Sequence, residues 1–174
     1  MIVGAGDFAN CRKGVSDCID ILAGCECPAV LVPGNGESFE ELAQACSSFD
    51  HLNVLHGNGI EIKGVSFFGI GGGIPITPFG SWSWDFDEET AAQLLNQCPK
   101  ECVLVSHSPP FGIADLSSSG QHCGSKSVRQ SIDDLMPKAL VCGHIHDSWE
   151  TCKTIGSTQV VNAGPKGLWI ELVL

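Results

Sequence analysis

The sequence is poor in positive charge. Only nine of its 174 residues are lysine or arginine, against 20 aspartates and glutamates, so the formal net charge is −11. Arg12 and Arg129 are the only arginines, and no basic cluster occurs. A protein that binds a nucleic-acid backbone needs such a cluster, so a nucleic-acid polymer is not an expected partner. An acidic protein that handles a phosphate needs cations from elsewhere, and bound metal is the obvious source.

The sequence also lacks long apolar runs. No run is long enough to cross a bilayer, and residues 1–30 have neither the basic start nor the apolar middle of a signal peptide. Internal repeats and low-complexity linkers are absent as well. We therefore expect one soluble, cytoplasmic domain over residues 1–174 with no membrane partner, since this length suits one well-buried core.

Paired CxxC spacing is a further absence, although the chain has ten cysteines. They are scattered over a mid-sized sequence, and Cys18, Cys46 and Cys142 fall within apolar patterns. This distribution favours free, mostly buried thiols over a disulfide framework.

Short apolar runs alternate with helical patterns along the chain. The runs that predict strands lie at residues 1–4, 29–32, 65–70, 102–106, 139–142, 159–161 and 168–174. The periodic segments that predict helices lie at residues 15–22, 38–46, 88–96 and 128–136. This order indicates an α/β or α+β layered domain. Turn signals predict hairpins at 57–59 and 63–64, and residues 71–87 read as a long loop.

Polar side chains follow four of the predicted strands, where each strand ends. Asp7, Asn35 and His107 each follow one strand, and a Gly-His-Ile-His segment places His144 and His146 after another. Loops at the carboxyl ends of strands gather at one edge of an α/β sheet, where ligands bind. We therefore expect the first four side chains to converge, with His146 adjacent.

One carboxylate, one amide oxygen and three imidazoles form a mixed oxygen and nitrogen ligand set. Such a set suits a first-row divalent ion, such as manganese, iron, zinc or nickel, better than calcium or magnesium. Taken alone, a histidine after a strand is more often a packed or solvent-facing residue than a ligand. The hypothesis of a metal site therefore depends on the whole ordered set.

The order Gly-Asp, Gly-Asn, His and Gly-His-x-His closely resembles the calcineurin-like metallophosphoesterase family. The segment Val-Val-Asn-Ala-Gly-Pro-Lys-Gly at 160–167 is similar to a turn of that family, and the resemblance covers nearly the whole chain. It implies a four-layer αββα sandwich of two facing mixed β-sheets flanked by helices. In that family two metal ions, bridged by an aspartate and a hydroxide, hydrolyse a phosphoester.

The resemblance also implies roles for single residues. Asp7 looks like the bridging aspartate, and Asn35, His107 and His144 would complete one metal site with it. His146 would belong to the other metal site. By the same resemblance Asp7, Asn35 and His107 are the expected catalytic residues.

Two departures from the family pattern matter. The family places a histidine after the asparagine, where it helps the leaving group, and here that position is Gly36. Restoring histidine there is expected to raise turnover in a version of the protein that has both metal ions, unless another group such as His56 or His122 already supplies the proton. The family also begins with a strand that ends in Asp-x-His, a pair that this chain, starting at Met1, does not contain. The expectation is a fold without the family's first strand and helix, at most one tightly bound metal ion, and impaired hydrolysis.

The leading hypothesis is metal-dependent hydrolysis of a phosphoester by a phosphodiesterase or phosphatase. The alternative is a non-catalytic descendant that uses the sandwich as a binding scaffold. The acidic charge favours a small soluble phosphoester as substrate. Trp82 and Trp84 in the long loop either stack on a substrate or pin the loop to the core, and pinning is favoured. Assembly into a homo-oligomer through an unpaired strand edge stays open.

Overall fold

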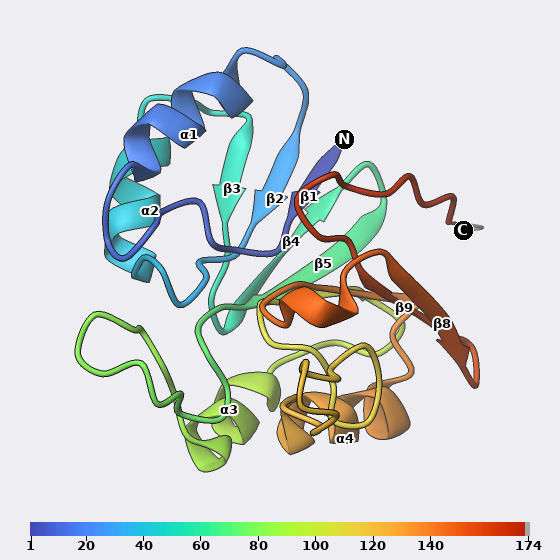
Figure 1. Ribbon diagram of the computed structural model, residues 1–174. Coiled ribbons are helices and arrows are strands. Elements are labelled where there is room, and N and C mark those ends of the chain that lie inside the picture. Colours follow the sequence, from blue (N-terminus) through green and yellow to red (C-terminus); the bar gives the residue numbers. More distant parts are fainter. Residues whose placement is uncertain (173–174) are drawn as a thin grey trace.

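The computed structural model describes residues 1–172 of the 174. Two sheets and four helices make up the fold, with a short 3-10 helix at His146–Ser148 (Figure 1). In chain order the elements are β1 (Ile2–Gly4), α1 (Val15–Ala23), β2 (Ala29–Leu31), α2 (Phe39–Cys46), β3 (Leu52–Val54), β4 (Asn58–Ile62), β5 (Val65–Ile70), α3 (Glu88–Leu95), β6 (Val103–Ser106), α4 (Lys126–Leu135), β7 (Ala139–Cys142), β8 (Thr151–Ile155) and β9 (Thr158–Asn162).

The two sheets differ in size and in strand direction. The smaller has three strands in the order β1-β2-β3, all parallel. The larger has six strands in the order β4-β5-β6-β7-β9-β8, and β4 and β8 at its two ends run antiparallel to their neighbours. The expectation of two mixed sheets is therefore wrong for the smaller sheet. Helices α1 and α2 connect its strands, and a helical crossover returns the chain so that the next strand is parallel.

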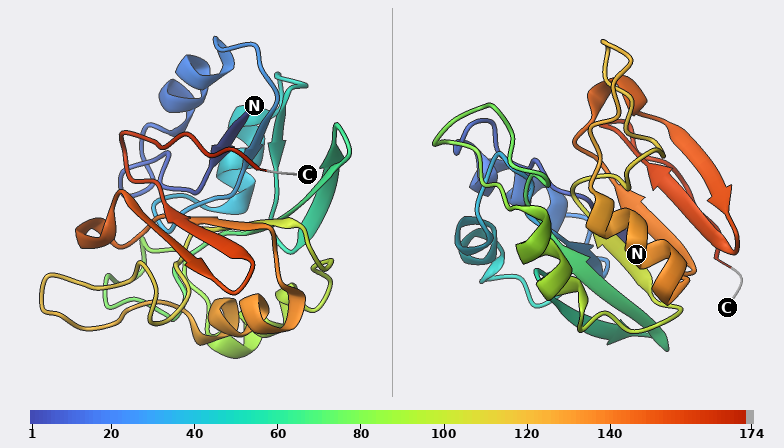
Figure 2. Two further views of the ribbon diagram at one scale, coloured as in Figure 1. Left: turned by 90° about the vertical axis from the view of Figure 1, so that its right-hand side faces the viewer. Right: turned by 90° about the horizontal axis from the view of Figure 1, so that it is seen from below.

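Helices cover the outer faces of both sheets, while the inner faces pack on each other. Within β2, Ala29 and Leu31 contact the α1 and α2 side, whereas Val30 and the following Val32 pack against the larger sheet. Successive side chains of a strand point to opposite faces, so a strand buried on both sides needs a continuous apolar run. Helices α3 and α4 lie side by side against the far face of the larger sheet (Figure 2).

The four predicted helices are present, with ends shifted by a few residues. The clearest start is that of α2, where Ser38 accepts from Glu41 N and the Glu41 carboxylate accepts from Ser38 N. This reciprocal pair satisfies two amides that the first turn leaves free. Helix α4 begins two residues before the predicted position because Ser125 caps it through Val128 N.

The predicted strands are less accurate than the helices. The short strand β3 and the largely exposed strand β8 carry weak apolar patterns, and neither was predicted. The apolar run at 168–174 was predicted as a strand, which is wrong over residues 168–172, while residues 173–174 lie outside the described part. Residues 58 and 59 begin β4 instead of forming a turn. The hairpin at Lys63-Gly64 is confirmed, with φ of 53° and 78° as a two-residue turn requires.

The cysteines are free thiols, as predicted, but most of them are not buried. All ten are unpaired, and the four buried ones are Cys46, Cys98, Cys102 and Cys142. The other six lie in loops, helix surfaces and the exposed strand β8, so the expectation of mostly buried thiols is wrong. Within residues 1–172, no helix has the length and apolar character needed to span a bilayer.

Candidate metal centre

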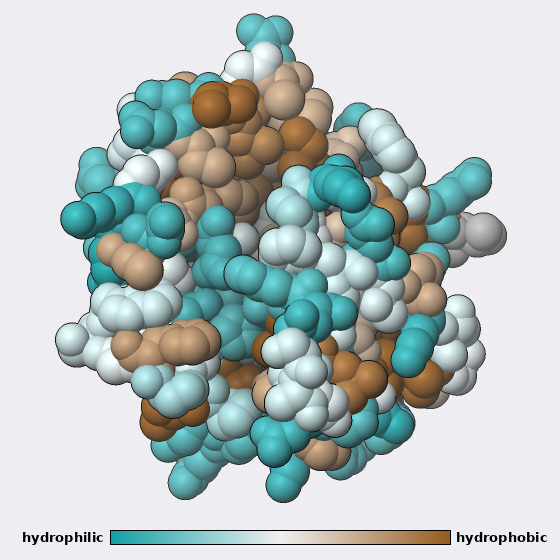
Figure 3. Space-filling model, in the orientation of Figure 1, coloured by the Kyte–Doolittle hydropathy of each residue, from teal (hydrophilic) through white to brown (hydrophobic). Residues whose placement is uncertain are grey.

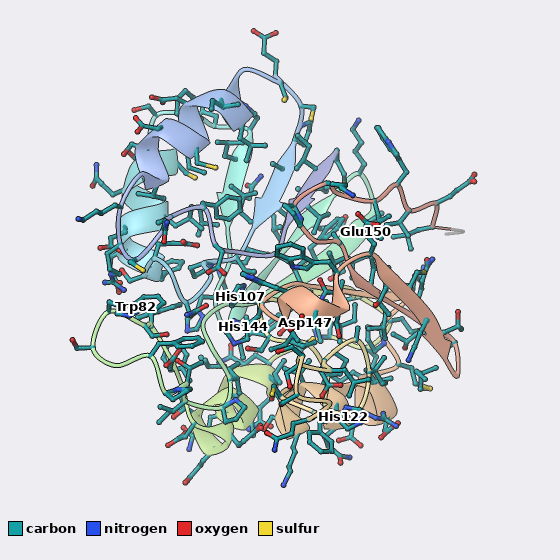
Figure 4. All side chains as sticks on the ribbon, in the orientation of Figure 1. Trp82, His107, His122, His144, Asp147 and Glu150 are labelled. Atoms are coloured by element: carbon teal, nitrogen blue, oxygen red, sulfur yellow. The ribbon has the colours of Figure 1, made fainter. Side chains whose placement is uncertain are left out.

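Four of the five predicted site residues meet where strands of the two sheets end. Asp7 and Asn35 follow β1 and β2 of the smaller sheet, and His107 and His144 follow β6 and β7 of the larger one. In Figure 4 the labels of His107 and His144 lie together near the centre of the view. The site is therefore built across the junction of the two sheets.

The polar atoms of these side chains form a tight group. Asn35 Oδ1 lies 3.2 Å from His107 Nε2 and 3.1 Å from His144 Nδ1. The two ring nitrogens are 3.1 Å apart, and Asp7 Oδ1 lies 3.5 Å from His107 Nε2. We call these four residues the strand-end cluster.

Very few hydrogens are available between the atoms of the strand-end cluster. His107 Nδ1 lies 2.7 Å from the carbonyl oxygen of Ala5, so we infer that it donates there and that Nε2 is an acceptor in the neutral ring. Burial, followed by the proximity of His107, lowers the pKa of His144 to about 3, so the ring of His144 is neutral. The amide of Gly36 donates to Asp7 Oδ1, and the facing Asn35 Oδ1, His107 Nε2 and His144 Nδ1 then share at most one hydrogen when His107 is neutral. A cation among them would satisfy the remaining lone pairs.

The spacing and chemistry of the strand-end cluster fit a divalent transition metal. At a metal–ligand distance of about 2.1 Å, neighbouring ligands are roughly 3.0 Å apart in an octahedron and about 3.4 Å apart in a tetrahedron. Four of the separations are 3.1 to 3.5 Å, close to these values, and the ligand atoms of Asp7, His107 and His144 all lie within 4.8 Å of one another. Two imidazoles, one amide oxygen and one carboxylate suit manganese, iron, zinc or nickel.

The backbone of the strand-end cluster is held in an unusual conformation. Asp7 and His144 have φ of 61° and 63°, in the left-handed region that residues with a Cβ seldom adopt. Such strain persists where the surrounding structure over-determines it, which is typical of functional sites. The neighbouring glycines allow the close packing, since a Cβ at Gly34 would overlap Asp7 and one at Gly6 would lie 2.5 Å from His107 Nδ1.

Gly36 has the same close-packing role, which changes one expectation. Its amide donates to Asp7 Oδ1 at 3.0 Å, and a Cβ at this position would lie 2.5 Å from the carbonyl oxygen of Ala9. A histidine here would displace the segment that carries Asp7. The close packing at Gly36 therefore argues against the prediction that Gly36→His raises turnover.

Glu37, which the sequence interpretation missed, joins the two loops of the smaller sheet. Its carboxylate is fully buried and accepts from Gly34 N at 2.6 Å and from Ala9 N at 2.9 Å. Burial raises the pKa of Glu37, against the opposing effect of these two hydrogen bonds. Glu37 therefore fixes the loop of Asp7 against the loop of Asn35. In the sequence, only its position directly after Gly-Asn-Gly could have indicated this role.

Ser83 and Asp85 were also missed, and they orient Asn35. The Asn35 amide nitrogen donates to Ser83 Oγ at 2.8 Å, and Ser83 Oγ donates to Asp85 Oδ1 at 2.8 Å. Asn35 therefore presents Oδ1 and not its amide group to the two histidines. No local sequence pattern predicts this contact, because it joins residues 48 positions apart.

The remaining histidines lie outside the strand-end cluster. His146 lines the same cavity, and its ring packs on Trp149 with the centroids 4.4 Å apart. His56 is packed beside Trp84 and Phe86, its Nδ1 accepts from Gly71 N, and burial lowers its pKa.

Of the two histidines considered as proton donors, His122 is the one that lines the cavity. Its Nδ1 lies 2.7 Å from the buried carboxylate of Asp115. Figure 4 shows it toward the lower right, away from the two clustered rings.

A cavity of about 740 Å³ opens over the strand-end cluster. Its walls come from the loop at 71–87, the segment at 117–123 and the segment around His146. In Figure 3 the middle of this face is largely hydrophilic, and hydrophobic residues lie at the lower left, over the loop at 71–87. A volume of this size suits a small-molecule ligand larger than a phosphate ion.

Comparison with known proteins agrees with this geometry. The family described as "Metallophosphoesterase, calcineurin superfamily" matches residues 10–167. An uncharacterized protein of Methanocaldococcus jannaschii is 34% identical over 98% of this chain and 79% of its own length. A UPF0046 protein of Caenorhabditis elegans is 33% identical over 62% of this chain and 27% of its own length.

Solved structures share the fold at low sequence identity. One aligns with a TM-score of 0.72 at 20% identity, over 87% of this chain and 63% of its own. The crystal structure of TT1561 of Thermus thermophilus aligns with a TM-score of 0.67 at 17% identity, over 94% of this chain and 76% of its own. The chain thus spans less than two thirds of the first of these structures and about a quarter of the nematode protein.

Proposed function

Because the chain belongs to the calcineurin superfamily of metallophosphoesterases, we propose that it hydrolyses a small phosphoester with the help of a divalent transition-metal ion. The observation that carries the proposal is the strand-end cluster, in which one carboxylate, one amide oxygen and two imidazole nitrogens face one another with few hydrogens between them. When bound, such a cation supplies a Lewis acid for the phosphoryl group and lowers the pKa of water.

The residues of the chain bind and orient in this proposal. Asp7, Asn35, His107 and His144 hold the cation, and Asp7 contributes the only negative charge among them. We assign His146, at the side of the same cavity, to a second cation site. His122, with Nδ1 held by Asp115, is the group in the cavity that can carry a proton to the leaving group.

The free thiols of the chain support a reducing compartment for the proposed reaction, and its net charge supports a small substrate. Ten free cysteines, several of them exposed, are typical of a reducing compartment such as the cytoplasm. A net charge of −11 disfavours polyanionic polymers and favours a small substrate.

Metal content and turnover test the proposal together. The 174-residue polypeptide is stripped with a chelator and reloaded with manganese, iron, zinc or nickel. We expect one tightly bound ion per chain by elemental analysis, because the described residues bring together one set of four ligand atoms. Hydrolysis of bis(4-nitrophenyl) phosphate or 4-nitrophenyl phosphate should return with the ion. Two tightly held ions and full activity would show that this ligand count is wrong.

A pair of histidine variants supplies the control. His107→Ala should lose both metal and turnover. His51→Ala should keep both, because His51 Nε2 contacts the carbonyl oxygen of Ala23 at the end of α1, outside the cavity. Equal metal binding by the two variants would contradict the assignment of the strand-end cluster.

The scaffold alternative is favoured by one observation, the close packing at Gly36, which leaves no room for a proton donor beside Asn35. A chain that binds one ion and hydrolyses neither a phosphodiester nor a phosphomonoester would support the scaffold. Metal-dependent turnover that His107→Ala abolishes would exclude it.

A further inference from the structure

One wall of the cavity over the strand-end cluster is apolar and exposed. Ile76 and Phe79 are 64% and 52% exposed although both are large hydrophobic residues. The rings of Phe79 and Trp82 are stacked, with centroids 5.6 Å apart and planes inclined by 14°. We call Ile76, Phe79 and Trp82 together the aromatic shelf. Figure 4 places Trp82 on the loop at the left, across from the labelled histidines.

The loop that carries the aromatic shelf is anchored at its base. Gly73 N donates to Trp84 O at 3.0 Å, and Phe86 N donates to Gly73 O at 2.8 Å. Thr77 donates its amide and its hydroxyl to the carboxylate of Asp85. Trp84 N also donates to Asn35 O at 3.0 Å, so the loop is joined directly to the strand-end cluster. The base of the loop therefore lies in a defined position beside the proposed cation, and the shelf extends from it.

The two tryptophans of this loop have different surroundings. Trp84 packs on the rings of His56 and Phe86, with centroids 4.8 and 4.7 Å away, so it pins the loop to the core. Trp82 stacks on the exposed Phe79 and lines the cavity instead. The preference for pinning thus describes Trp84, while Trp82 is placed to contact a ligand.

The charges around the cavity limit what can bind there. The described residues that line it include Asp7 and Asp147 but no lysine or arginine. Arg12, which lies near the Asp7 loop, is paired with Glu41 at 3.2 Å. A ligand with several negative charges would therefore meet carboxylates with only the bound cation to offset them. A single negative charge at the cation and a neutral remainder match this lining.

We propose that the aromatic shelf binds a neutral planar ring of the substrate, so that the substrate is a phosphodiester with one negative charge and an aromatic substituent. This inference rests on the proposed function, because it takes the phosphoryl group to lie at the strand-end cluster. The ring stacks on Phe79 and Trp82, and the volume of about 740 Å³ accommodates both parts of such a molecule.

Binding of phosphinates to the metal-loaded chain tests the inference without turnover. Benzyl(methyl)phosphinate has one negative charge, a planar ring and no ester bond. Its cyclohexylmethyl analogue has the same charge without the planar ring, and its 4-carboxybenzyl analogue adds a second negative charge. By calorimetry we expect the benzyl probe to bind about 2- to 10-fold more tightly than the cyclohexylmethyl probe, and the carboxylated probe to bind more weakly than both.

Two shelf variants and one control locate the effect. Trp82→Ala and Phe79→Ala should each reduce the preference for the benzyl probe, while circular dichroism stays unchanged. Trp169→Ala should keep the preference, because Trp169 is fully exposed and does not line the cavity.

The outcomes separate the inference from the proposed function. Metal-dependent hydrolysis with equal binding of the benzyl and cyclohexylmethyl probes, or with a preference that survives both shelf variants, overturns the shelf and leaves the function standing. A benzyl preference that Trp82→Ala removes, in a chain that hydrolyses no phosphoester, supports the ring site and overturns hydrolysis. Tighter binding of the carboxylated probe contradicts the argument from charge.

Discussion

The strand-end cluster and the loop at 71–87 face one cavity, but they are held in place differently. The cluster depends on the docking of two sheets and on glycines that let neighbouring loops touch. The loop depends on a few polar contacts around Asp85 and on the packing of Trp84. The comparison indicates that changes in the cluster should be costly, whereas changes in the loop should adjust the site without destroying it.

Removing the charge of the cluster should give the largest effect. Asp7→Asn keeps the side-chain shape but removes the only negative charge, so metal affinity should fall by about 100-fold or more, beyond the usual cost of losing an outer-shell contact. Titration with cobalt, followed by absorption, measures the affinity. Asp147→Asn is the matched control, since Asp147 lines the same cavity and bonds Ser118 N instead. Affinities of the two variants within threefold of each other would remove the contrast between cluster and surroundings.

Filling the space at Gly36 should give the next largest effect. Gly36→Ala places a Cβ against the carbonyl oxygen of Ala9, and overpacking of this kind costs about 1–3 kcal/mol of unfolding free energy. Gly24→Ala is the control, because a Cβ there has its nearest contact at 3.4 Å, an ordinary van der Waals distance. Urea denaturation compares the stability of the two variants. Equal midpoints would show that the loops around Asp7 accommodate the added Cβ without a loss of stability.

A change in the loop should weaken the site more mildly. Ser83→Ala removes the acceptor that orients the Asn35 amide, so metal affinity should fall about 10-fold, as is usual for a residue that supports a ligand. The overall fold should be unchanged. Ser117→Ala also lies at the cavity but contacts only its own segment, so it should bind metal normally. A loss as large as that of Asp7→Asn would mean that the loop is as essential as the cluster.

The smallest effect should be a change in the pH dependence of stability when His56, which packs beside Trp84 of the loop at 71–87, is replaced. Burial lowers the pKa of His56 in the folded protein, so the unfolded chain binds more protons below its ordinary value of 6.5. Stability should therefore fall as pH drops from 7 to 5, and by less in His56→Gln. Urea midpoints of metal-free protein at both pH values measure this, with His144 contributing alike to both chains. An identical drop in the two proteins would rule out a contribution from His56.

The sequence predicted those parts of the fold that are decided locally. Buried runs such as Ala29–Leu31 and the capping box at Ser38 and Glu41 produce strong signals, because each depends on neighbouring residues. The exposed edge strand Thr151–Ile155 gives a weak one, since it is held by its partner β9 and not by its own apolar character. The run at 168–172 shows the reverse error, an apolar pattern without a neighbouring strand.

The candidate site also has parts that the sequence predicts and parts that it does not. Asp7, Asn35, His107 and His144 follow strand ends, and the topology brings strand ends together, so their convergence could be anticipated. The contact of Asn35 with Ser83 depends on the path of a 17-residue loop, which no local pattern specifies. The steric need for glycine at position 36 became visible only with the position of Ala9.

The placement of the strand-end cluster across both sheets has a consequence for folding. Asp7 and Asn35 come from one sheet, and His107 and His144 from the other, so a cation held by all four acts as a tether between the two halves of the sandwich. Such a cation binds only when the sheets are docked, and at 100 times its dissociation constant it would stabilise the docked state by about 2.7 kcal/mol. Chelation should then speed hydrogen exchange at amides between the sheets, which couples the availability of metal in the cell to the lifetime of the folded chain.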